Sequence, residues 1–163
     1  LQRAYQTAYE IAKIHNLPVH QDRSFRERCY GICEGMKDGE IREAYPESYK
    51  AWYAADPDHF FPDGERKTES PRQFHHRAVN AIREAATRYP GKKIAIVTHF
   101  GVIETAYRTA QNIPLGTHCR MPVLNTSINR FRWTGGTLEL LQWGEASHLE
   151  EGRKPPVDYY RHY

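Results

Sequence analysis

The residue best placed to do chemistry is His99, which stands where a predicted strand meets a predicted helix. Ile94 to Val97 form an apolar run rich in β-branched residues, behind a Pro90-Gly91 turn signal. This pattern is typical of a strand buried on both faces. Open α/β sheets bind ligands at such strand ends, where the N–H groups of a helix N-terminus favour an anion. The other interpretation is a histidine that only satisfies the hydrogen bonds of a strand end.

Two charged residues earlier in the chain are further candidates. Arg3 lies in the first turn of a predicted helix over Leu1–Asn16, where a cation opposes the helix dipole unless an anion is near. Glu27 stands between Arg26 and Arg28, which favour its ionised form if the three side chains stay close. Each has a structural interpretation as well: a solvated surface side chain for Arg3, and a surface ion pair for Glu27.

The elements that must position these residues alternate between strand and helix patterns. Val19 to Glu27 predict a short strand or extended segment, and Ser70-Pro71 with Gln73 is a strong helix start with a capping box. A Gly-Gly turn predicts a hairpin of Ile128 to Trp133 with Thr137 to Trp143. The aromatic residues between Gly39 and Thr68 predict an excursion over the sheet edge, either a lid or a satellite core. Residues from about 145 to 163 predict an extended tail.

The composition fits one globular domain over residues 1–163. The chain is 39% hydrophobic and 26% charged, with a net charge of +3 and no block of Lys or Arg that predicts a nucleic-acid partner. No apolar run is long enough to span a membrane. Cys29, Cys33 and Cys119 are an odd number without zinc-finger spacing, which favours free thiols in a reducing, cytoplasmic compartment. A homodimer remains open.

The start of the chain predicts that a segment precedes it. The helix over Leu1–Asn16 begins without a capping residue, and the only methionines are Met36 and Met121. We therefore expect the domain to be truncated at its N-terminus.

Several segments together resemble the histidine phosphatase superfamily, whose fold is that of phosphoglycerate mutase. Leu1–Ala8 resembles its L-x-R-A-x-x-T-A helix, and Val97–Ile103 resembles its V-T-H-G-G-V-I segment with Phe100 for the first Gly. Phe25–Glu27 with Gly31–Gly35 resembles the family's L-x-E followed by G-x-x-E-G. Thr68–Ser70 resembles its G-E-S helix start, and Asn125–Ser127 resembles its N-T-S turn.

The resemblance implies a three-layer α/β sandwich with a mostly parallel central sheet, helices on both faces and a C-terminal hairpin. It implies a phosphohistidine mechanism, without metal or cofactor, on a small phosphorylated substrate. Arg3 would bind the phosphoryl group together with His99 and the Phe100 N–H, and Glu27 would be the general acid and base. The nucleophile belongs to an Arg-His-Gly motif that the 163 residues lack, so the first strand is expected upstream of Leu1.

Three functions stay open at this point. The preferred one is a phosphomonoester hydrolase, because the excursion from Gly39 to Thr68 is modest and no long insertion precedes the hairpin. The alternatives are a phosphoglycerate mutase of the same superfamily and a non-catalytic module that binds a phospho-ligand. Without the upstream segment, the chain alone is expected to be inactive.

Overall fold

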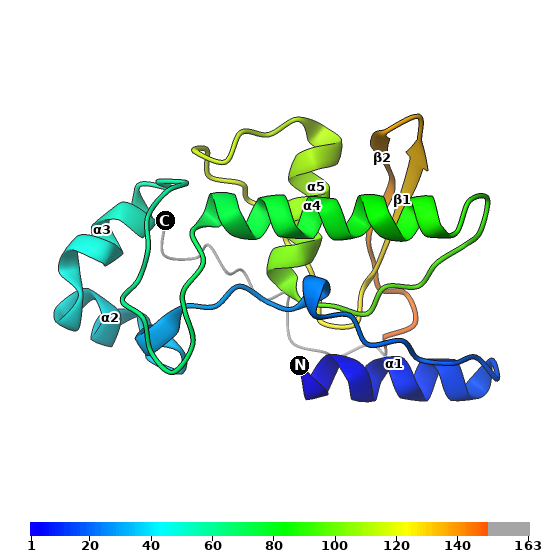
Figure 1. The fold of residues 1–163 in the computed structure, drawn as a ribbon, viewed down its shortest axis with the longest axis horizontal. Coiled ribbons are helices and arrows are strands. Elements are labelled where there is room, and N and C mark those ends of the chain that lie inside the picture. Colours follow the sequence, from blue (N-terminus) through cyan, green and yellow to red (C-terminus); the bar gives the residue numbers. More distant parts are fainter. Residues whose placement is uncertain (150–163) are drawn as a thin grey trace.

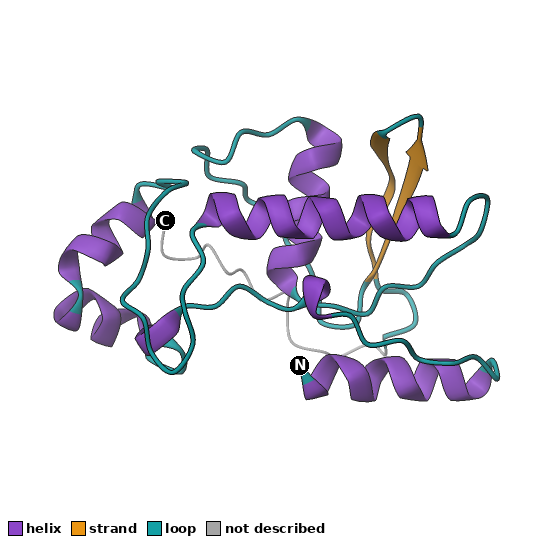
Figure 2. Ribbon diagram, in the orientation of Figure 1, coloured by secondary structure: helices purple, strands orange, loops and turns teal. Residues whose placement is uncertain are grey.

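The computed structural model describes residues 1–149. Within this range helices dominate, and the strands are confined to one hairpin (Figures 1 and 2). No helix among the described residues is long and apolar enough to cross a membrane. The elements in chain order are α1 (Gln2–Ile14), η1 (Arg23–Phe25), η2 (Gly31–Cys33), α2 (Asp38–Ala44), α3 (Pro46–Tyr53), α4 (Pro71–Arg88), α5 (Phe100–Gln111), β1 (Ile128–Thr134) and β2 (Thr137–Glu145), where η1 and η2 are 3₁₀ turns.

Helix α4 begins as its sequence predicts. The Ser70 hydroxyl accepts a hydrogen bond from the Gln73 N–H at 3.2 Å, and the Gln73 side chain accepts one from the Ser70 N–H at 3.3 Å. This capping box satisfies two N–H groups that a helix end leaves unpaired. The apolar face of α4 packs on α5, where Phe74 and Ala78 form a buried cluster with Val102.

The predicted hairpin is confirmed, with longer strands than expected. Gly135 and Gly136 both have positive φ, the conformation that a two-residue type I′ turn requires. Strand β2 packs against α5, and the rings of Tyr107 and Trp143 lie 4.6 Å apart. Because β2 runs to Glu145, the extended tail cannot begin at residue 145, and residues 150–163 lie outside the described part of the chain.

The predicted parallel sheet does not form within the described residues, where β1 and β2 make the only sheet. Ile94 and Ile96 are each 41% exposed, so the expectation of a strand buried on both faces is wrong here. The reason is that a strand forms only through hydrogen bonds to a neighbouring strand, and residues 92–98 have no strand partner in the range described. Val19 to Glu27 likewise run irregularly through η1. The two segments still meet, because the Thr98 hydroxyl donates to the Phe25 carbonyl at 2.7 Å.

The excursion from Gly39 to Thr68 forms a lobe of its own at one end of the molecule (Figure 1). Helices α2 and α3 pack together around a second buried cluster of Cys33, Ile41 and Phe61. Partly buried side chains surround this cluster: Tyr30, Met36, Tyr45, Tyr49 and Trp52. The prediction of a satellite core is therefore correct, and this core also forms a wall of a cavity.

Candidate active site

Glu27 is held at the N-terminus of α5. One carboxylate oxygen accepts the Gly101 N–H at 3.1 Å, and the other accepts the Arg28 N–H at 2.9 Å. Gly101 allows this approach because a Cβ at that position would overlap the Glu27 carboxylate and press on the Phe74 ring. The helix dipole favours a negative charge at this end. The alternative of a surface ion pair for Glu27 is not what the described residues show, since Arg26 pairs with Glu69 instead.

His99 is the N-cap residue of the same helix, with extended backbone dihedrals. Its side chain is only 6% exposed. Burial, reinforced by the positive charge of Arg3, lowers the pKa of His99 to about 4. The imidazole is therefore neutral at physiological pH, so one ring nitrogen carries a hydrogen that it can donate.

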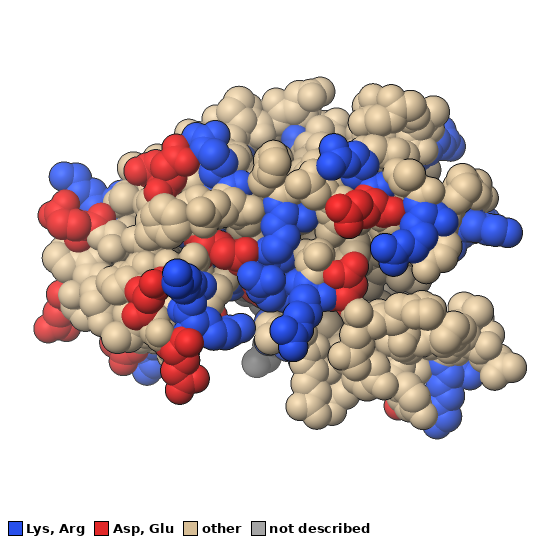
Figure 3. Space-filling model, viewed as in Figure 1, with Lys and Arg blue, Asp and Glu red and all other residues tan. Residues whose placement is uncertain are grey.

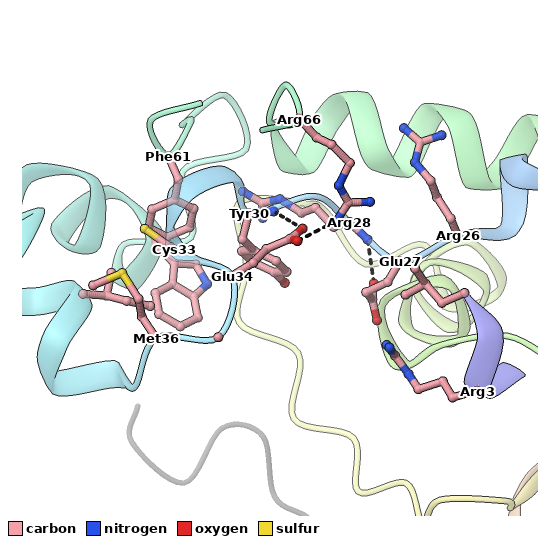
Figure 4. Close-up of a pocket in the computed structure, with 14 residues that line it drawn as sticks. Arg3, Arg26, Glu27, Arg28, Tyr30, Cys33, Glu34, Met36, Phe61 and Arg66 are labelled. Carbon is pink, nitrogen blue, oxygen red and sulfur yellow. Dashed lines mark hydrogen bonds and ion pairs between the residues drawn. The ribbon is translucent and has the colours of Figure 1, made fainter. Parts of the chain in front are cut away.

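Arg3, the third predicted site residue, lies on α1, opposite Glu27. Figure 4 shows its guanidinium directed toward the Glu27 carboxylate, across an open space. Arg3 and Glu27 both line a cavity of about 490 Å³. His99 and Phe100 do not line this cavity, although the charge of Arg3 reaches His99. The structure thus brings Arg3 and Glu27 to one cavity. His99 is not part of the cavity lining, but it precedes by two residues Gly101, whose N–H binds Glu27.

The cavity has a charged side that the sequence analysis did not foresee. Arg26, Arg28 and Arg66 also line it, and Lys and Arg side chains gather near the middle of this face of the molecule (Figure 3). Arg66 pairs with Glu34 at 2.5 Å. No motif marks Arg66 in the sequence, because a lone Arg in a loop carries no prediction by itself.

Arg28 is buried in the cavity wall and is held by several neighbours. Its guanidinium donates to the Glu69 carbonyl at 2.8 Å and lies 3.1 Å from His59 Nε2, over the Tyr30 ring. His59 Nδ1 lies 2.5 Å from the Asp56 carbonyl, which fixes that nitrogen as the protonated one and leaves Nε2 to accept from Arg28. Burial lowers the pKa of His59, which favours this neutral form.

Glu69 connects the segment around Glu27 to α4. Its carboxylate forms two hydrogen bonds of 2.7 Å with Arg77 and one of 3.1 Å with Arg26. Burial alone would raise the pKa of Glu69, but the hydrogen bonds and charge of Arg77 outweigh it and hold the pKa below its usual value. Arg77 also donates to the Ser24 and Arg26 carbonyls. These bonds fix the backbone that carries Glu27.

Metal chemistry has no ready ligand set in this part of the chain. Among residues 1–149 no three His, Cys, Asp or Glu side chains lie together in a way that could hold a metal ion. The cavity instead presents guanidinium groups near a carboxylate. These are donors suited to a phosphoryl group, whose negative charge spreads over its oxygens.

Comparison with known proteins identifies relatives over most of the chain. It is 37% identical over 153 residues to "Phosphoglycerate mutase-like protein 4" and 31% identical over 151 residues to "Metal-independent phosphoserine phosphatase", both from Arabidopsis thaliana. These matches cover 93% and 91% of the chain but only 64% and 60% of the two relatives, so the chain spans less than two thirds of their length. "Phosphoserine phosphatase 1" of Hydrogenobacter thermophilus is 30% identical over 93% of the chain and 70% of its own length.

A solved structure and a family profile agree with these relatives. The fold matches the structure of "Mycobacterial hydrolase 1" with a TM-score of 0.69 and 20% identity, over 89% of this chain and 73% of that one. Likeness at that identity concerns the fold alone. The profile of the histidine phosphatase superfamily (branch 1) matches residues 1–146. With relatives at this identity and coverage, the chain belongs to the histidine phosphatase superfamily.

Proposed function

We propose that the protein is a phosphomonoester hydrolase that acts through a phosphohistidine intermediate, with the nucleophilic His on a segment upstream of Leu1. The observation that carries the proposal is the position of Glu27. Its carboxylate sits at the N-terminus of α5, two residues from the neutral His99, and faces the Arg3 guanidinium across the cavity. A transferring phosphoryl group in that space would meet the Arg3 guanidinium and the Glu27 carboxyl group together. His99, which lies within reach of the charge of Arg3, would be the neutral donor.

In the proposed first step, the nucleophilic His nitrogen bonds to phosphorus while the bond to the leaving oxygen breaks. Protonated Glu27 gives its proton to that oxygen, and the product leaves as an alcohol. Arg3 offsets the charge on the phosphoryl oxygens with its planar fork. His99 and the Phe100 N–H are the further donors that the proposal assigns to this charge. In the second step water attacks phosphorus while the bond from phosphorus to the His nitrogen breaks, Glu27 takes a proton from the water, and inorganic phosphate leaves.

Hydrolysis is preferred to a mutase reaction, although one relative is named for its likeness to phosphoglycerate mutase. Two of the relatives are named as phosphoserine phosphatases, and this favours transfer of the phosphoryl group to water. A mutase needs a bisphosphorylated primer, so turnover without added bisphosphoglycerate supports the hydrolase. Strict dependence on that primer would contradict it. We also place the activity in the cytoplasm, which the three buried free thiols support.

The test is to trap the phosphoenzyme. A protein extended by the segment upstream of Leu1 is mixed briefly with a phosphate ester labelled with ³²P and then denatured. We expect an acid-labile, base-stable label on a peptide that precedes Leu1, and no label on a protein that consists of residues 1–163 alone. An acid-labile label on that shorter protein would overturn the proposed nucleophile and assign it to one of the nine histidines present.

A further inference from the structure

The cavity beside Glu27 has two chemically different ends. Arg3 and Glu27 lie at one end, and the cluster of Cys33, Ile41 and Phe61 (the second hydrophobic cluster) forms the wall of the other (Figure 4). We propose that the organic part of the substrate is an apolar ring system, so that the protein prefers aryl phosphates to phosphorylated amino acids or glycerates. This inference rests on the proposed function only for the position of the phosphate.

The wall of the apolar end is built from side chains that pack against one another. Cys33, Ile41 and Phe61 are buried, and their neighbours Met36 and Trp52 also line the cavity. The ring of Trp52 meets that of Phe61 edge to face at a centroid distance of 5.7 Å. A second aromatic edge is the natural partner for such rings, because offset and edge-to-face pairs are favoured beyond simple burial.

The size of the cavity allows a substrate larger than phosphate alone. At about 490 Å³ it falls within the usual range for small-molecule sites. The phosphate would occupy only the end near Arg3. The remaining space runs along the apolar wall. An apolar leaving group that binds there removes its own surface and that of the wall from water, which is favourable.

A charged leaving group has no ready partner at the apolar end. The charged residues that line the cavity there already have partners: Arg28 donates to the Glu69 carbonyl and to His59, and Arg66 and Glu34 pair with each other. Phosphoserine would bring both a carboxylate and an ammonium group against this wall. A charged group that loses water against an apolar wall without gaining a partner is unfavourable, and recruiting Arg66 or Glu34 would break the ion pair between them.

Binding to the chain of residues 1–163 tests this without any catalytic step. Isothermal titration would compare four probes: 2-naphthyl phosphate, 2-naphthol, O-phosphoserine and inorganic phosphate. We expect naphthyl phosphate to bind about tenfold or more tightly than inorganic phosphate, and phosphoserine to bind no more tightly than inorganic phosphate. Tighter binding of phosphoserine than of naphthyl phosphate would overturn the proposal, as would failure of naphthyl phosphate to bind at millimolar concentration.

A pair of ring deletions in one cluster provides the matched control. Trp52 and Tyr49 both pack against the second hydrophobic cluster, but only Trp52 lines the cavity. We expect Trp52→Leu to weaken naphthyl phosphate about tenfold and inorganic phosphate hardly at all, whereas Tyr49→Leu leaves both unchanged. If Trp52→Leu does not fold by circular dichroism, Met36→Gln makes the same wall polar and carries the same expectation. Equal effects of Trp52→Leu and Tyr49→Leu would refute the assignment of the wall.

A third variant separates this inference from the proposed function. Arg3→Met should weaken naphthyl phosphate and inorganic phosphate alike, about tenfold, and leave 2-naphthol unaffected. No effect of Arg3→Met on either phosphate would contradict the proposed phosphate site. An effect of Arg3→Met together with no effect of the changes at the apolar wall would refute the substrate class alone.

Discussion

The neutral state of His99 predicts how the stability of the fold depends on pH. The imidazole has an ordinary pKa of 6.5 in the unfolded chain and about 4 in the fold, because it is buried and faces the charge of Arg3. Above pH 6.5 both states are neutral, so the full stability is present. Below pH 6.5 the His99 imidazole binds a proton in the unfolded chain but stays neutral in the folded chain. Stability is therefore lost as the pH falls from 6.5 toward 4.

The size of this loss follows from the two pKa values. At pH 5 the unfolded imidazole is almost fully protonated and the folded one is mostly neutral, which costs roughly 2 kcal/mol of unfolding free energy. Net stabilities are only about 5–15 kcal/mol. With a urea dependence of about 2 kcal/mol per molar, the unfolding midpoint should move by about 1 M through His99 alone.

The assay is urea unfolding at pH 7.5 and pH 5.0, of the protein and of His99→Gln. His59 and His75 also have pKa values lowered by burial, so both proteins will lose stability. The unmodified protein should lose about 2 kcal/mol more. The ¹H NMR signal of the His99 ring should titrate near pH 4. Equal losses in the two proteins, or a His99 midpoint near pH 6.5, would refute the buried neutral imidazole and with it the basis for the proposed donor.

Three further predictions concern the site. Gly101→Ala should destabilise the fold by about 1–3 kcal/mol and displace Glu27, because the added methyl group meets the Glu27 carboxylate and the Phe74 ring; Gly39→Ala, which meets nothing within 4 Å, is the control for thermal melts and should not lower stability. In the extended protein, Glu27→Gln should reduce turnover strongly with alkyl phosphates and less with p-nitrophenyl phosphate, whose leaving group needs little protonation; equal losses with both would make Glu27 a structural residue. Turnover should survive EDTA, since Arg3 and neutral donors meet the phosphoryl charge; abolition by EDTA, with rescue by Mg²⁺ or Zn²⁺, would point to a metal phosphatase.

The elements that the sequence predicts well are those whose signals lie within a few residues. The capping box at Ser70 and the turn at Gly135-Gly136 act over two to four positions, and the structure has both. The apolar run at Ile94 predicts a strand, but a strand exists only through hydrogen bonds to other segments. Local pattern supplies no information on whether those partners are within the chain.

The contacts around the cavity cannot be predicted from local sequence patterns either, because they join residues that are far apart in the chain. Arg28 meets His59 across 31 positions and the Glu69 carbonyl across 41. An arginine that donates to a backbone carbonyl leaves no mark in residue type, because any residue could supply that oxygen. The resemblance to the family did identify Arg3, Glu27 and His99, and the structure places them near one another; their catalytic roles remain proposals.

Glu27 and His99 come together although the predicted sheet is absent from the described residues, and the packing explains how. Arg77 on α4 fixes the Ser24 and Arg26 carbonyls, so the backbone before Glu27 is tied to α4. The cluster of Phe74, Ala78 and Val102 ties α4 to α5, and Gly101 then presents its N–H to Glu27. The position of Glu27 relative to His99 is thus set by the contact between two helices. Strand pairing is not needed to hold it, and we conclude that this half of the site is built into the packing of α4 against α5.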